Sequence, residues 1–265
     1  MFDAIFIFKL LLTFLVGSLW ITGATVVAEK FGSKIGGVIG GMPSTIVIAL
    51  FFIGWTQSPL VAAASTVVIP VIMGIDGLFI LTYTYVSRFH VPLAILASLL
   101  VWFILSLGLV LVHFQSFGIS LLCFVLLLGC SYIVMEYHWH VKSIAGRSYA
   151  FSLLNLILRG ALSGSIITIA VALAKLGGPL LGGAFASFPA VFLSTMIITY
   201  LAQGRAFSVS VLKIMMISGT IDVTIYASAV RLFYPTIGLV EGTISAFLLS
   251  LVSAYLIYLL VKKIA

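Results

Sequence analysis

Charged residues are scarce in this sequence. Only 7% of its 265 residues are Asp, Glu, Lys or Arg, whereas 63% are hydrophobic. Soluble domains carry about a quarter charged residues, so this composition excludes that class. Apolar runs of about 20 residues are long enough to cross a bilayer as helices. The composition therefore predicts an all-α polytopic membrane protein with the lipid bilayer as its main surroundings.

Cysteine is rare too, and recognisable catalytic motifs are missing. Cys123 and Cys130 lie seven residues apart on one apolar segment, about 10 Å along a helix axis. That distance is too long for a disulfide bond, and we expect two buried thiols. The sequence has no nucleophile elbow, phosphate-cradling loop or metalloprotease helix. An enzymatic role is disfavoured, and we expect no cofactor.

One short segment, MEYHWHVK, brings together Glu136, His138 and His140. A carboxylate and two imidazoles are metal-ligand types, but no cysteine or second cluster accompanies them. Aromatic residues of this kind are typical of a membrane interface. We therefore expect an interfacial segment here and no metal site.

Hydropathy windows of about 19 residues predict nine transmembrane helices. These spans cover residues 5–28, 35–55, 60–87, 92–113, 117–135, 150–174, 178–201, 206–231 and 236–261. The connections between them are short, which leaves no room for a soluble domain. Lys9 interrupts the first span, so we expect that span to be retained rather than cleaved as a signal peptide.

The excess of basic residues predicts the orientation of the chain. Eight of the thirteen Lys and Arg residues fall on one side of the predicted spans and two on the other, with three inside spans. Positive loops stay in the cytoplasm. The N-terminus is therefore expected outside and the C-terminus inside, in a bacterial cell inner membrane. The net charge of +7 is then a topology signal, and no nucleic-acid partner is expected.

The sequence contains an internal repeat with an offset of 146 residues. This shift places Gly36-Gly37 on Gly182-Gly183, Pro43 on Pro189 and Asp76 on Asp222 without a gap. Such residues are unusual inside membranes, so their agreement is informative. The chain divides into a first repeat at 1–114, a connecting span at 115–146 and a second repeat at 147–265.

The number of spans predicts how the two repeats are related. Four spans, one connector and four spans (4+1+4) start the second repeat on the opposite face, which gives an inverted repeat. Secondary transporters use this arrangement, with substrate bound near the midplane at the repeat interface. We expect a secondary-active transporter of a small solute or ion that works by alternating access, with coupling to a proton or cation.

Three ionisable residues lie deep in the predicted spans. Asp76 and Asp222 are each 16 residues into their spans, and Arg159 matches Asp76 in depth. Charged groups at that depth are costly and usually functional, so the aspartates are candidate proton or cation sites. Arg159 either pairs with Asp76 or extends its side chain to the interface. Pairing would make Asp76 the more structural aspartate and Asp222 the one that titrates freely.

Two glycine- and proline-containing stretches, GGVIGGMPST at 36–45 and GGAFASFPAV at 182–191, interrupt apolar spans. Small residues four apart allow a close helix crossing, and a following proline breaks the helix. Broken backbone at membrane depth lines a cavity or lies inside protein. The candidate binding residues in these stretches are Gly40, Gly41, Pro43, Ser44, Ser187 and Pro189.

The same glycine-rich spans, with GGMPST in one repeat and ASFPAVFLST in the other, resemble the GlpM-type family of small bacterial inner-membrane proteins. That family has one four-span unit, whereas this chain carries two. The resemblance implies a bacterial inner-membrane protein and no particular substrate. The aspartates are not part of the family pattern.

Two other functions stay open beside transport. One is a non-transporting membrane scaffold or assembly subunit, in which the aspartates and Arg159 fix helices together. The other is a lipid flippase or channel-like pore. Homo-oligomer formation also stays open.

Overall fold

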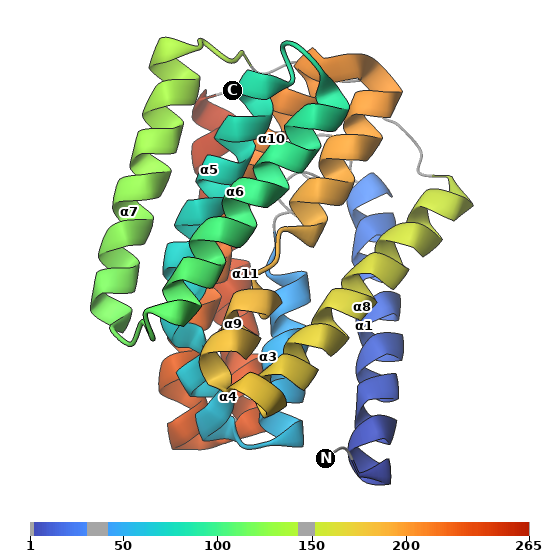
Figure 1. The fold of residues 1–265 in the computed structure, drawn as a ribbon, viewed down its shortest axis with the longest axis vertical. Coiled ribbons are helices and arrows are strands. Elements are labelled where there is room, and N and C mark those ends of the chain that lie inside the picture. Colours follow the sequence, from blue (N-terminus) through green and yellow to red (C-terminus); the bar gives the residue numbers. More distant parts are fainter. Residues whose placement is uncertain (1–2, 31–41, 143–151, 265) are drawn as a thin grey trace.

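Helices form nearly all of the described chain. The computed structural model describes residues 3–30, 42–142 and 152–264 (Figure 1). Within these ranges the chain contains helices and their connections and no strand. The helices are α1 (Ala4–Lys30), α3 (Ser44–Thr56), α4 (Pro59–Ser65), η1 (Thr66–Val68), α5 (Ile69–Val86), α6 (Val91–Leu111), α7 (Phe117–Ile133), η2 (Val134–His138), α8 (Leu153–Gly177), α9 (Pro179–Ala186), α10 (Ala190–Ile237) and α11 (Leu239–Ile264).

Seven helical stretches among the described residues are long and apolar enough to cross a membrane, and α3 is a shorter apolar helix of 13 residues. Large apolar side chains such as Leu19, Leu100 and Leu126 are exposed on the outer helices, as expected of a surface that faces lipid. The protein is a helical membrane protein. The seventh and eighth predicted spans both fall in one stretch, Pro179–Ile237.

That stretch reverses direction inside α10. Gly204 has φ 80° and ψ −178°, which is not helical and is accessible almost only to glycine. The Ser208 hydroxyl donates a hydrogen bond of 3.0 Å to the Met196 carbonyl. Twelve residues of straight helix would separate these positions by about 18 Å. The first segment of α10 (190–203) therefore packs beside its second segment (205–237).

Helices α1 and α8, which are equivalent under the repeat, pack together in opposite directions. A Cβ on Gly164 would lie 2.8 Å from the Phe14 carbonyl oxygen, and one on Gly160 would lie 3.0 Å from that of Ser18. The order of contacts runs forward along α1 and backward along α8, as Figure 1 also shows. The 146-residue shift places residue 14 on 160 and residue 18 on 164. Exchanging the two repeats therefore turns the contact between 14 and 164 into the contact between 160 and 18. This mutual pattern is that of a two-fold interface.

The glycine pair of the second repeat lies at a close helix crossing. A Cβ on Gly183 would lie 2.0 Å from the Ser65 carbonyl oxygen, and one on Gly182 would lie 2.4 Å from the Ala174 Cβ. Only glycine allows this approach between α9, the end of α4 and α8. The small residues thus have the packing role predicted for them, while Gly36 and Gly37 lie outside the described residues.

Helix α7 packs along α5 at one side of the molecule (Figure 1). A Cβ on Gly77 of α5 would lie 2.8 Å from the Ser131 hydroxyl of α7. The π-turn η2 after α7 holds Glu136, which forms an ion pair with Lys213 of α10. Helix α7 therefore touches both halves. The prediction of two buried thiols is wrong, because Cys130 is exposed on α7 and Cys123 is only half-buried.

Polar side chains join the first repeat to the second at the end of the molecule nearer the C-terminus. The Arg205 guanidinium donates hydrogen bonds of 3.0 Å to the Ser87 hydroxyl and to the Thr84 carbonyl. The hydroxyls of Tyr83 and Ser208 lie 3.1 Å apart. These bonds tie the end of α5 to the turn within α10.

Candidate functional site

Two proline breaks with the same backbone geometry define the centre of the molecule. Pro43 has φ −73° and ψ 39°, and Pro189 has φ −75° and ψ 45°. The next N–H group, of Ser44 or Ala190, donates a 2.7 Å hydrogen bond to the carbonyl two residues before it. Helices α3 and α10 begin at these points because proline provides no donor to continue a preceding helix.

Both new helices start without a capping side chain. The N–H groups of Thr45 and Ile46 in α3, and of Val191 and Phe192 in α10, lack helical acceptors because they are in the first turn. No described residue accepts a hydrogen bond from them. Four backbone donors and the positive ends of two helix dipoles are therefore available in this region.

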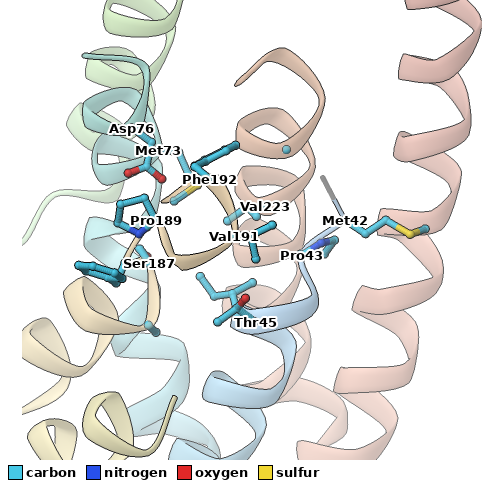
Figure 2. A pocket seen from close by; sticks show the side chains of 14 residues that line it. Met42, Pro43, Thr45, Met73, Asp76, Ser187, Pro189, Val191, Phe192 and Val223 are labelled. Atoms are coloured by element: carbon cyan, nitrogen blue, oxygen red, sulfur yellow. The ribbon is translucent and has the colours of Figure 1, made fainter. Parts of the chain in front are cut away.

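These helix ends face one cavity of about 60 Å³. Figure 2 shows Asp76, Met73 and Phe192 on one side of it and Pro43 and Thr45 on the other. Its lining includes five pairs of positions equivalent under the 146-residue shift, among them Pro43 with Pro189, Ile46 with Phe192 and Met73 with Gly219. The cavity thus lies where the two repeats meet.

Among the described residues, Asp76 is the one charged side chain in the lining of this cavity. It lies on α5 and is only 1% exposed. Its Oδ1 accepts a 2.9 Å hydrogen bond from the Trp102 indole, and no described residue donates to Oδ2. The Trp102 ring packs against Phe188, with centroids 5.0 Å apart, and Phe188 lines the cavity. One carboxyl oxygen is therefore fixed and the other is available.

Asp222 has the equivalent position on α10 but different surroundings. It is also 1% exposed. Its Oδ2 accepts a 3.2 Å hydrogen bond from the Ser250 hydroxyl, and its Oδ1 accepts one from the Ser253 hydroxyl. Asp222 does not line the cavity. Each aspartate is bound to the helix that follows its own, but only Asp76 faces the shared space.

Arg159 lies on α8 and is 7% exposed. It does not pair with Asp76, although their predicted depths match. The described partner of the Asp76 carboxyl group is the Trp102 indole. Pairing with Arg159, which would have made Asp76 the more structural aspartate, is therefore missing. The geometry favours Asp222 as the structural aspartate, since two serines donate to it.

The other predicted residues divide into three groups. Pro43, Ser187 and Pro189 line the cavity with Asp76. Ser44 is the first residue of α3 beside it, while Gly40 and Gly41 lie outside the described residues. No group of three or more potential metal ligands occurs in the described ranges.

Several lining residues were not singled out in the sequence. Thr45 lies two residues after Pro43 and Phe188 directly precedes Pro189, so the quoted stretches already contained them. Met73 lies three residues before Asp76, one helical turn away on the same face. Trp102 carried no signal, because its contact with Asp76 depends on how α6 packs against α5.

The chain belongs to a family recognised by its sequence, DUF3147. The model of the family described as "Protein of unknown function (DUF3147)" matches residues 10–115 and again residues 156–263. The two matches begin 146 residues apart (156 − 10), the offset of the internal repeat. The resemblance to the GlpM-type family stays a prediction. No curated protein and no solved structure matches this chain.

Proposed function

We propose that this protein is a secondary-active transporter with nine transmembrane helices in a 4+1+4 inverted repeat. The cavity between the two proline breaks is its substrate site. Transporters of this design bind substrate near the midplane with interrupted helices, whose free backbone groups contact the solute. The observation that carries the proposal is that equivalent positions of both repeats, together with the buried carboxyl group of Asp76, line one cavity.

The packing of the helices supports the inverted repeat. Equivalent helices α1 and α8 cross in opposite directions and exchange contacts. The reversal at Gly204 divides Pro179–Ile237 into two antiparallel segments. Counted in this way, the seven long stretches become eight, and we count the shorter apolar helix α3 as the ninth.

The distribution of basic residues supports a bacterial inner-membrane orientation with the C-terminus in the cytoplasm. Arg205 binds the end of α5 near Ser87, at the end that holds the C-terminus in Figure 1. At the other end, the Lys175 ammonium lies 3.8 Å from the ring centroid of Phe6, beside the N-terminus. The positive-inside rule assigns the more basic end to the cytoplasm.

Alternating access needs a contact that closes one side of the site. The hydrogen bonds of Arg205 with Ser87 and Thr84 join the halves on the cytoplasmic side. We propose that they close this side in the present conformation and break when the site opens inward.

The test is uptake into proteoliposomes that contain the full-length protein. A panel of labelled small solutes is offered with and without an inward pH gradient. We expect at least one solute to accumulate only with the gradient. Asp76→Asn should abolish this accumulation, because asparagine keeps the size of the side chain but cannot bind and release the proton. Asp222→Asn is the matched control, and we expect it to retain uptake.

Scaffold and pore functions give different results in the same assay. A scaffold would accumulate no solute, and Asp76→Asn would mainly lower its melting temperature. A pore would equilibrate the solute without accumulating it, whatever the gradient. Either result would refute the transporter proposal.

A further inference from the structure

We propose that the cavity binds a small monovalent anion together with one proton on Asp76. This inference rests on the proposed transport function and specifies its substrate class. The solute would have a few non-hydrogen atoms and an oxygen-rich anionic end, as a short monocarboxylate does.

The charges around the cavity balance when it is empty. The N-terminus of a helix carries about +0.5 elementary charge. Helices α3 and α10 direct two such ends to the cavity, which together supply about one positive charge. An ionised Asp76, the one charged side chain among the described lining residues, cancels that charge. The site without substrate is then electrically neutral.

Protonation of Asp76 changes this balance. The carboxyl group becomes neutral, and the two helix ends leave an uncancelled positive charge of about one unit. Helix N-termini bind anions through their free N–H groups. One monovalent anion restores neutrality, so anion and proton are expected to bind together and leave together.

The hydrogen-bonding groups fit the same ligand. The N–H groups of Thr45, Ile46, Val191 and Phe192 are donors without described acceptors. A carboxylate offers about four lone-pair sites to such donors. Asp76 itself accepts from Trp102 through Oδ1 and keeps Oδ2 available for a proton.

The size and the remaining lining limit the ligand further. The volume of about 60 Å³ has room for about four water molecules, or a solute of similar size. Met73, Phe192 and Val223 supply apolar surface for a short hydrocarbon part. A metal cation is disfavoured, because hard cations require several oxygen ligands and the described lining residues supply one carboxyl group.

The test is equilibrium binding to the purified full-length protein, with labelled acetate as the anion, acetamide as its neutral analogue and methylammonium as the cation. Binding is measured at about pH 6 and about pH 8, and acetate is ionised at both values. We expect acetate to bind at least about tenfold more tightly at the lower pH. Acetamide should bind weakly at both values, and methylammonium should not bind.

The Asp76→Asn variant separates the roles of charge and shape. Asparagine imitates the protonated carboxyl group, so acetate binding should persist and lose its dependence on pH. Asp222→Asn should behave like the unmodified protein, because that residue lies outside the cavity.

The opposite pattern would overturn the inference. If methylammonium binds more tightly as the pH rises and Asp76→Asn abolishes binding, the site takes cations, while gradient-driven uptake would still support transport. Equal binding of acetate and acetamide would also exclude an anion site. Loss of gradient-driven uptake for every solute would instead refute the transport proposal itself.

Discussion

Asp76 and Asp222 occupy equivalent positions, yet their carboxyl groups have different partners. Ser250 and Ser253 lie three residues apart on one face of α11 and both donate to Asp222. The equivalent residues of α6 are Ile104 and Leu107, which cannot donate. Trp102 supplies the one described donor to Asp76. Divergence of the partner helix therefore explains why one aspartate is enclosed by donors and the other faces the cavity.

We expect Ser253→Ala to lower stability without affecting uptake. The change leaves a buried carboxyl oxygen of Asp222 without its donor, at a cost of about 1–3 kcal/mol. The melting temperature of the purified protein and gradient-driven uptake measure the two effects. Ser228→Ala is the control, because that hydroxyl only bonds the Thr224 carbonyl of its own helix. A Ser253→Ala protein with an unchanged melting temperature but lost uptake would give Asp222 the transport role.

At the residue scale, the sequence predicted which positions to examine but not their partners. Both aspartates, Pro43 and Pro189 were found because polar residues and prolines are unusual in apolar spans. The partners are 26 residues away for Asp76 and 28 and 31 for Asp222, on separate helices. Their contacts depend on helix rotation and packing, which hydropathy does not encode.

At the scale of the elements, glycine determines where helices cross. We expect Gly183→Ala to destabilise the protein by at least about 1–3 kcal/mol, the usual cost of overpacking. The added Cβ would lie 2.0 Å from the Ser65 carbonyl oxygen, a backbone atom that cannot rotate away. Thermal unfolding in detergent measures the loss.

The matched control is Gly129→Ala in α7. A Cβ at this position meets nothing within 4 Å, so alanine should keep or slightly raise stability, since it is the better helix former. Equal melting temperatures for the two variants would show that the crossing of α9 and α4 is not tightly packed.

The boundaries of elements were predictable where a single residue enforces them. The prolines fixed the starts of α3 and α10, and the predicted connection at 202–205 includes Gly204, where α10 reverses. The reversal itself needs only one non-helical residue. The connection predicted at 202–205 is therefore helical in the structure except at Gly204.

For the whole molecule, orientation is the property most directly testable. We expect a fluorescent protein fused after residue 265 to fold in the cytoplasm and an alkaline phosphatase at the same position to be inactive, because the basic end of the molecule stays inside. The same two reporters fused after His113, in the short turn before α7, should give the reverse pattern. An active phosphatase at the C-terminus would contradict the orientation.

The whole-molecule arrangement was only partly predictable. The repeat offset came from matching unusual residues, and the two family matches begin with the same offset. The meeting of both proline breaks at one cavity required the tertiary structure, because it depends on how the helices of the two halves pack together. The ion pair of Glu136 with Lys213 was likewise not foreseen, since Glu136 was expected in an interfacial segment and Lys213 lies in the predicted span 206–231.

Helix α7 has a consequence for the ancestry of the chain. Two units with four spans each, joined directly, would enter the membrane the same way up. In the arrangement we propose, the single additional span formed by α7 makes the second unit enter the membrane in the opposite orientation. Before such a linker existed, the same cavity would have required separate copies of a single unit inserted in both directions. The fusion then made each half free to change alone, and the serines that enclose Asp222 but not Asp76 are the kind of change that identical subunits could not have acquired on one side only.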